Sequence, residues 1–136
     1  MDIIIHKTKL LKSGDDEVDK IAEDLQMENG FSETIFFHDK RFLIRYFNCL
    51  RVGERYNISK ESLEYLLDKC KFILEVTDGK YSNDEEIRTF RYLGVDFFRA
   101  RNEYTFNPEF LQDIIDKFSN LNMNWEENRL YIEYRW

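Results

Sequence analysis

Arginine residues that alternate with aromatic residues are the feature of this sequence best suited to ligand chemistry. Residues 42–47 and 88–92 carry this pattern most densely. A guanidinium group is a flat, permanently charged fork that matches phosphate and carboxylate and stacks on aromatic rings. We therefore expect a surface that binds a nucleotide, an RNA segment or an acidic protein. This Arg/aromatic surface comprises Arg41, Arg45, Tyr46, Arg88, Arg91, Tyr92, Arg99 and Arg101.

A second interpretation is that these arginines pair with carboxylates of the same chain. Eight of the ten arginines lie within residues 31–58 and 88–106, which are net positive, whereas the rest of the chain is mostly acidic. Acidic residues such as Glu61, Glu64 and Asp68 are then available as partners. Both interpretations stay open from the sequence alone.

The overall charge restricts the class of partner. The chain has 27 acidic and 20 basic residues, for a formal net charge of −7. This net negative charge disfavours non-specific binding to DNA or RNA, because the negatively charged nucleic-acid backbone repels the protein. Acidic faces can instead imitate that backbone and dock onto a basic groove, with long-range attraction increasing the association rate.

The common catalytic motifs are missing. His6-Lys7-Thr8 has the His-x-Thr form of two-histidine phosphoesterases, but His38 is followed by Asp39 and Lys40, so the second motif is missing. The chain has no GxSxG, no GxxxxGK[ST], no GxGxxG and no HExxH. We expect a non-enzymatic protein without a cofactor, although a small enzyme of unrecognised type stays open because acid–base pairs assemble across a fold.

The two cysteines predict neither a metal site nor a disulfide. Cys49 and Cys70 are far apart, without a CxxC pattern, and their spacing to His6 and His38 does not resemble a zinc site. Both fall in apolar segments that we expect to be helical, so we predict buried free thiols in a reducing cytosol. No apolar run is long enough to span a membrane, and the polar N-terminal segment does not resemble a signal peptide.

Local patterns predict the elements of the first half of the chain. Three consecutive isoleucines at residues 3–5 favour a strand, and His6 at its end is expected to be a surface or hydrogen-bonded histidine. A cap at Asp15 and Asp16 and the terminator Asn29-Gly30 bound a first helix. Ser32 is expected to begin a central helix that runs to about Leu50, with Phe31 and Phe36 as a hydrophobic staple.

The second half contains the most regular periodicity. Apolar residues recur every three or four positions between the cap Ser59 and the terminator Asp78-Gly79, which predicts a helix. Residues 80–86 read as a loop, and residues 89–100 as one or two strands broken near Gly94. Asn107-Pro108 begins a last helix that reaches Leu121, and residues 129–136 alternate as a half-buried strand. The predicted fold is α+β, a single domain over residues 1–136 with about four helices packed on a small, mainly antiparallel sheet.

From about residue 36 onward the chain resembles a family of small uncharacterised phage proteins. The resemblance rests on the aromatic-rich residues 36–47, on residues 59–71, and on residues 95–136 with their Trp-terminated strand. It implies a setting, namely the bacterial cytoplasm during phage infection. Small acidic proteins of that setting often bind and disable host factors, CRISPR effectors among them.

The leading functional hypothesis is therefore a phage-type binding protein that engages a host protein or ribonucleoprotein and inhibits a defence system. Its binding surface is expected to be either the acidic faces or the Arg/aromatic surface. The alternative is a protein that binds a nucleotide or a small anion through the arginines, which a thermal-shift screen against nucleotides would distinguish.

Overall fold

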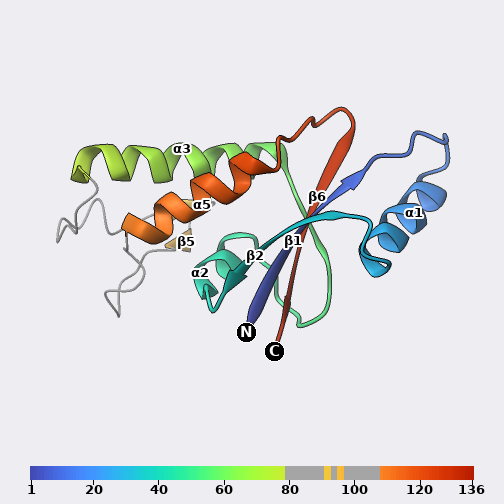
Figure 1. Ribbon diagram of the computed structural model, residues 1–136, viewed down its shortest axis with the longest axis horizontal. Helices are drawn as coiled ribbons and strands as arrows, with labels where there is room; N and C mark the ends of the chain where they lie inside the picture. Colours follow the sequence, from blue (N-terminus) through green and yellow to red (C-terminus); the bar gives the residue numbers. More distant parts are fainter. Residues whose placement is uncertain (79–90, 93–94, 97–107) are drawn as a thin grey trace.

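The computed structural model describes residues 1–78, 91–92, 95–96 and 108–136, and these residues form a domain of mixed helix and strand (Figure 1). They contain four helices packed on a four-stranded antiparallel sheet, together with a separate two-stranded hairpin. The predicted α+β class is confirmed, since the connections do not follow the βαβ pattern of a parallel sheet.

Strands from both ends and the middle of the sequence form the sheet. They are β1 (Asp2–Lys9), β2 (Glu33–His38), β3 (Tyr56–Ile58) and β6 (Asn128–Arg135). Their order is β2-β1-β6-β3, and every neighbouring pair is antiparallel. The first and last strands predicted from the sequence are therefore confirmed, and they lie side by side at the centre of the sheet, so that the two chain ends are close together (Figure 1).

Three of the four helices in the described part of the chain begin and end close to the predicted signals. The four are α1 (Asp16–Glu28), α2 (Arg41–Tyr46), α3 (Lys60–Thr77) and α5 (Pro108–Asn120), and the three that match are α1, α3 and α5. The Asp15 side chain accepts hydrogen bonds from the first turn of α1, and the Ser59 hydroxyl accepts one from the Ser62 amide of α3. These caps satisfy amides that the helix itself leaves unpaired. Asp78 ends α3 in the left-handed conformation, with φ 53°.

The predicted helix from Ser32 to Leu50 is wrong. Its first part is strand β2, and only the six residues of α2 are helical. Phe36 and Phe37 lie on opposite faces of the sheet and are 55% and 2% exposed, respectively. Phe31 is 80% exposed, so the predicted staple does not form. Pairing of all six β2 residues with residues 2–7 of β1 outweighs the weak helical preference of this β-branched and aromatic segment.

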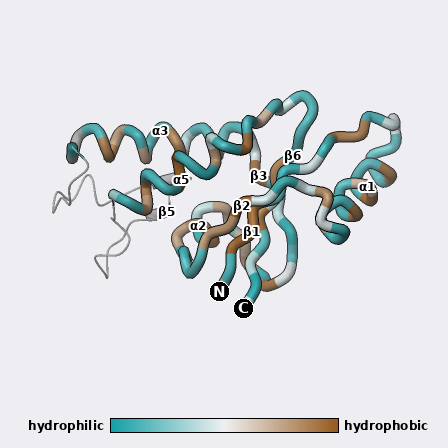
Figure 2. Tube along the Cα trace, viewed as in Figure 1, coloured by the Kyte–Doolittle hydropathy of each residue, from teal (hydrophilic) through white to brown (hydrophobic). Residues whose placement is uncertain are grey.

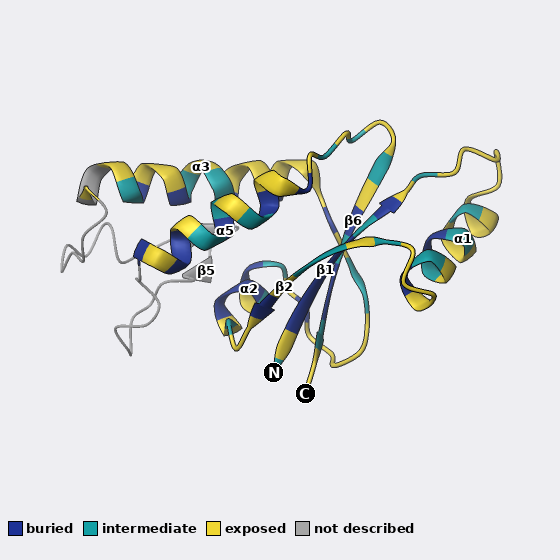
Figure 3. Ribbon diagram, in the orientation of Figure 1, coloured by how far each residue is buried: buried dark blue, intermediate teal, exposed yellow. Residues whose placement is uncertain are grey.

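The hydrophobic core lies on one face of the sheet, against α2, α3 and α5. Ile3, Ile5 and Ile132 contribute fully buried side chains from β1 and β6. The predicted helical stripes pack onto them, and Figure 3 shows their buried positions in dark blue. The buried stripe residues are Leu63, Leu66, Cys70 and Ile73 of α3 and Leu111, Ile114 and Phe118 of α5, with Leu121 just beyond α5.

Of the one or two strands predicted around Gly94, the structure has two, which pair antiparallel. They are β4 (Arg91–Tyr92) and β5 (Val95–Asp96). The predicted loop at residues 80–86, the rest of the predicted strand segment and the predicted cap at Asn107 lie outside the described residues.

Candidate functional site

The Arg/aromatic surface predicted from the sequence is only partly described. Arg41 and Arg45 lie four residues apart on α2, and both are exposed. The prediction that Tyr46 belongs to this surface is wrong. Its ring is buried in the core, and its hydroxyl donates a 2.6 Å hydrogen bond to the carbonyl oxygen of Ser62. A side chain held in this way cannot contact a ligand at the surface.

The remaining members of that surface lie elsewhere. Arg91 and Tyr92 belong to β4, in a sheet separate from the four-stranded one, and their side chains are not described. Arg88, Arg99 and Arg101 lie outside the described residues. The nucleotide-binding alternative thus stays a prediction that rests, within the described part of the chain, on Arg41 and Arg45.

Other arginines form ion pairs with carboxylates of the same chain, as the second interpretation expects. Their partners are not the predicted Glu61, Glu64 and Asp68. Arg51 contacts Glu54 at 3.6 Å in an exposed pair, and Arg129 contacts Glu23 at 3.3 Å. Two more arginines converge on Glu133.

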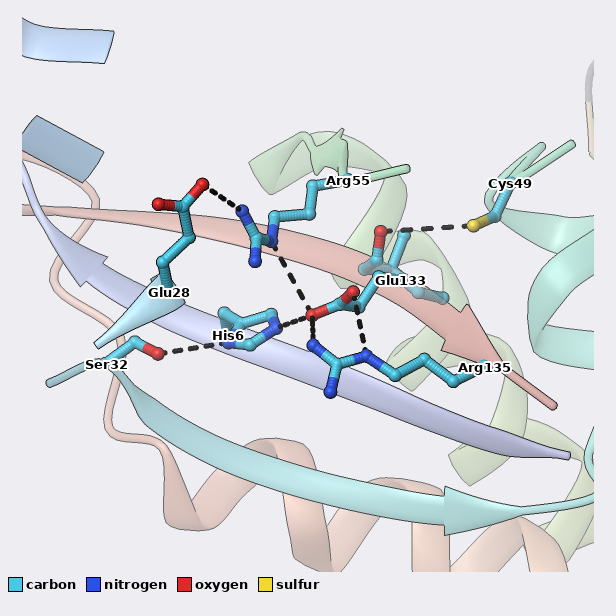
Figure 4. A network of polar contacts seen from close by, with 8 residues as sticks. His6, Glu28, Ser32, Cys49, Arg55, Glu133 and Arg135 are labelled. Carbon is cyan, nitrogen blue, oxygen red and sulfur yellow. Dashed lines mark hydrogen bonds and ion pairs between the residues drawn. The ribbon is translucent and has the colours of Figure 1, made fainter. Parts of the chain in front are cut away.

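A group of polar residues is held on the face of the sheet opposite the main core. We call it the polar cluster, and it consists of His6, Ser32, Arg55, Glu133 and Arg135 (Figure 4). His6 comes from β1 and Glu133 from the neighbouring β6, so the central strand pair positions both side chains. Ser32 lies in the connection from α1 to β2, and Arg55 directly precedes β3.

Hydrogen bonds join His6, Ser32, Glu133 and Arg135 of the polar cluster, and ion pairs add Arg55. His6 Nε2 lies 2.5 Å from Glu133 Oε1, and His6 Nδ1 lies 3.0 Å from the Ser32 hydroxyl. Arg135 donates to both carboxylate oxygens of Glu133, at 3.1 and 3.3 Å. The Arg55 Nε atom lies 3.6 Å from Glu133 Oε1, and its guanidinium also faces Glu28 at 3.8 Å.

Burial, neighbouring charges and hydrogen bonds together set the protonation states in the polar cluster. Burial lowers the pKa of His6 below its usual value, and the positive charges of Arg55 and Arg135 lower it further, against the opposing effect of Glu133. Burial opposes ionisation of Glu133, but the hydrogen bonds from His6 and Arg135 outweigh it and lower the pKa of this carboxyl group. A neutral His6 therefore donates Nε2–H to an ionised Glu133, which leaves Nδ1 to accept the Ser32 hydroxyl proton.

A second buried carboxylate joins α1 to the same face of the sheet. The Tyr131 hydroxyl of β6 donates a short hydrogen bond to the buried Glu23 of α1, and Arg129 lies beside the same carboxylate. Burial and this hydrogen bond raise the pKa of Tyr131 above its usual value. These polar contacts help to attach α1 to the sheet, together with the buried Met27.

The outer side of α1 is apolar. Val18, Ile21 and Leu25 recur at helical spacing and are 48%, 59% and 49% exposed. The sequence places them on one stripe, which in most amphipathic helices faces a core. Here that stripe is exposed to solvent, and α1 accordingly carries brown hydrophobic segments in Figure 2 and yellow exposed segments in Figure 3. Together with the acids of this helix other than the buried Glu23, we call this stripe the α1 surface.

The charge of the α1 surface is strongly negative. The helix contains six carboxylates and a single lysine. Helical spacing places Glu17, Asp24 and Glu28 along one border of the apolar stripe. This combination of an exposed apolar stripe and a carboxylate border is typical of a surface that docks onto another protein.

The thiols of the two cysteines are buried and unreactive at neutral pH. Cys49 and Cys70 are buried and free, as predicted, although Cys49 follows α2 and is not inside a helix. Burial raises the pKa of Cys49 to about 11 and that of Cys70 to about 12, so both remain protonated at neutral pH. Within the described ranges, no cluster of three or more metal-ligating side chains occurs, and no helix is long and apolar enough to cross a membrane.

Comparison with protein-family models, with curated proteins and with solved structures finds no match.

Sequence reasoning missed both features for physical reasons. It expected His6 to be exposed or hydrogen-bonded, and the hydrogen-bonded form is confirmed, but its partner Glu133 is 127 residues away. The alternation of residues 129–136 assigned Glu133 to the polar side of the last strand. Only the pairing of β1 with β6 shows that this polar side also carries His6.

The protonation states lead to a pH dependence of stability. The pKa of His6 is lower in the folded chain than the ordinary 6.5, so the unfolded chain binds more protons below that pH. We expect the free energy of unfolding to fall as pH drops below 6.5, and to fall again below 4.5 as Glu133 is protonated. Urea denaturation between pH 8 and pH 4 would measure both steps. The first step should vanish in His6→Gln and persist in His38→Gln, whereas a wild-type stability that is flat from pH 7 to pH 5 would contradict this assignment.

Proposed function

We propose that this protein is a non-enzymatic binding protein that docks onto a partner protein through the α1 surface. The observation that carries the proposal is the exposure of Val18, Ile21 and Leu25 on one stripe of a helix whose opposite side buries Glu23. Exposed apolar stripes of this kind are costly in water unless a partner covers them. The docking mode would be that of a helix laid against a groove, with anchors at positions i, i+3 and i+7.

The charges of α1 support a basic partner. Apart from the buried Glu23, the helix carries five carboxylates against one lysine, which would attract a groove bordered by lysine and arginine and would increase the association rate. The same charges oppose the pairing of α1 with α1 of a second copy, because like charges would face each other across the interface. The proposed partner is therefore a different protein, or the protein component of a ribonucleoprotein.

The resemblance to small phage proteins suggests where such a partner would be found. We propose a macromolecule of the bacterial host, bound in the cytoplasm, and inhibition of a defence system such as a CRISPR effector as the consequence. Proteins that bind nucleic acids carry basic grooves. An acidic helix with an apolar stripe would compete for such a groove.

Binding is tested by comparing three baits in a bacterial lysate. The wild-type protein, the double variant Ile21→Asp/Leu25→Asp and the control Phe72→Asp would each be used to capture partners. Phe72 is an apolar side chain of α3 that is 52% exposed, so it matches the changed residues outside the α1 surface. We expect one host protein to be captured by the wild type and the control but not by the double variant.

The captured protein would then be purified and its affinity measured. Loss of two central apolar anchors should weaken binding by about 30-fold or more, which corresponds to roughly 2 kcal/mol. The association rate should fall as salt is added. Equal binding by the wild type and the double variant, with both folded by circular dichroism, would contradict the proposed surface.

A further inference from the structure

Ser32, His6 and Glu133 of the polar cluster form a hydroxyl–imidazole–carboxylate series. The Ser32 hydroxyl lies 3.0 Å from His6 Nδ1, and His6 Nε2 lies 2.5 Å from Glu133 (Figure 4). A nucleophile within hydrogen-bond reach of a base, which a third group orients in turn, is the geometry that activates a serine. We propose that Ser32 is an activated nucleophile that accepts an acyl group from an activated ester.

The surrounding groups hold this series in the required state. His6 and Glu133 are buried, so their hydrogen bond is shielded from water. Arg135 binds both oxygens of Glu133 and keeps the carboxylate ionised and oriented. The neutral imidazole then has its proton on Nε2 and a free lone pair on Nδ1, directed at the hydroxyl.

Ser32 can be reached from solvent. It lies in the connection between α1 and β2 and is only partly buried, in contrast to its two partners. Its neighbour Phe31 is exposed. An acyl donor could therefore approach the hydroxyl from outside while the base and the carboxylate remain buried.

The acyl transfer is balanced within these groups and the donor. The Ser32 oxygen forms a bond to the carbonyl carbon of the ester, and the bond from that carbon to the leaving oxygen breaks. The hydroxyl proton moves to His6 Nδ1 and from there to the leaving oxygen. The product is an O-acyl serine at position 32 and a free alcohol or phenol, so the site is one of covalent modification and does not require turnover.

Ser13 and His38 provide matched comparisons within the same chain. The Ser13 hydroxyl is exposed and hydrogen-bonds to Asp19 and to a backbone carbonyl, with no imidazole beside it. His38 is an exposed histidine that contacts Asp2 at 3.0 Å. Ser13 thus reports the reactivity of an ordinary hydroxyl, and His38 that of an ordinary imidazole.

The test is acetylation of the full chain by 4-nitrophenyl acetate, followed by peptide mapping with mass spectrometry. General-base assistance is worth roughly 100-fold or more, so we expect Ser32 to be acetylated about 100-fold faster than Ser13 in the same sample. His6→Gln should remove this advantage, and His38→Gln should leave it unchanged. If Ser32 reacts no faster than Ser13, the proposal is overturned.

The pH profile of the wild type separates catalysis from a structural role of His6 and does not depend on whether His6→Gln folds. The acetylation rate at Ser32 should rise as His6 becomes neutral, with its midpoint below pH 6.5 because the pKa of His6 is lowered, and should then level off. An unassisted hydroxyl would instead keep reacting faster up to alkaline pH, and that profile at Ser32 would also overturn the proposal. Neither result depends on a partner at the α1 surface, so the binding proposal stands or falls separately.

Discussion

Glu133→Ala is expected to lower the free energy of unfolding by about 3–5 kcal/mol, which is the usual effect of breaking a buried ion pair. The carboxylate of Glu133 accepts hydrogen bonds from His6 and Arg135 and faces Arg55. Removal of the carboxylate leaves the His6 N–H and the Arg135 guanidinium without their hydrogen-bond acceptor. It also leaves the charge of Arg55 without its partner at a site partly shielded from water. Urea denaturation at pH 7 would measure the change.

The matched control for Glu133 is Glu64→Ala on α3. Glu64 forms an exposed pair with Lys60 at 3.9 Å, and such pairs contribute about 0.5 kcal/mol or less. Glu133→Gln should fall between the two variants, because it keeps the shape of the side chain and loses its charge. A Glu133→Ala variant as stable as Glu64→Ala would show that the polar cluster contributes nothing to folding.

Phe118→Ala is expected to have an effect of similar size, about 3–5 kcal/mol, for a different reason. Phe118 of α5 is almost fully buried, and its ring centroid lies 5.8 Å from that of Phe37 and 6.3 Å from that of Phe47. Truncation removes both ring contacts and leaves a cavity between α5 and β2. The thermal unfolding midpoint and the urea midpoint should both fall.

Phe72→Ala on α3 is the matched control for Phe118. It deletes the same ring from a position that is 52% exposed, so we expect a change below about 1 kcal/mol. If both variants lose the same amount of stability, the position of Phe118 in the core is wrong. The comparison needs no functional assay.

Local signals in the sequence predicted the elements that depend on local interactions. The cap at Ser59 and the apolar stripe after it suffice to define α3, and the proline at residue 108 begins α5. The isoleucines of β1 and the alternation of β6 were also sufficient. In each of these segments, propensity, periodicity and burial agree.

Non-local pairing decided the parts that the sequence did not predict. Residues 33–38 have apolar side chains that suit a helix or a strand, and pairing with β1 selects the strand. The apolar spacing of α1 predicted the helix correctly, but not that its stripe faces solvent while Glu23 is buried. The polar cluster needs residues 6, 32, 55 and 133 to converge, and no local pattern indicates this.

The strand order has a consequence for the way this chain reaches its native state. β6 lies between β1 and β3, so among the described strands β3 pairs only with the last element of the sequence. The sheet therefore closes over a loop that spans nearly the whole chain, which is the slowest kind of contact to form. During synthesis, α3 and the β1–β2 ladder can assemble early, whereas the polar cluster can form only when Glu133 has left the ribosome.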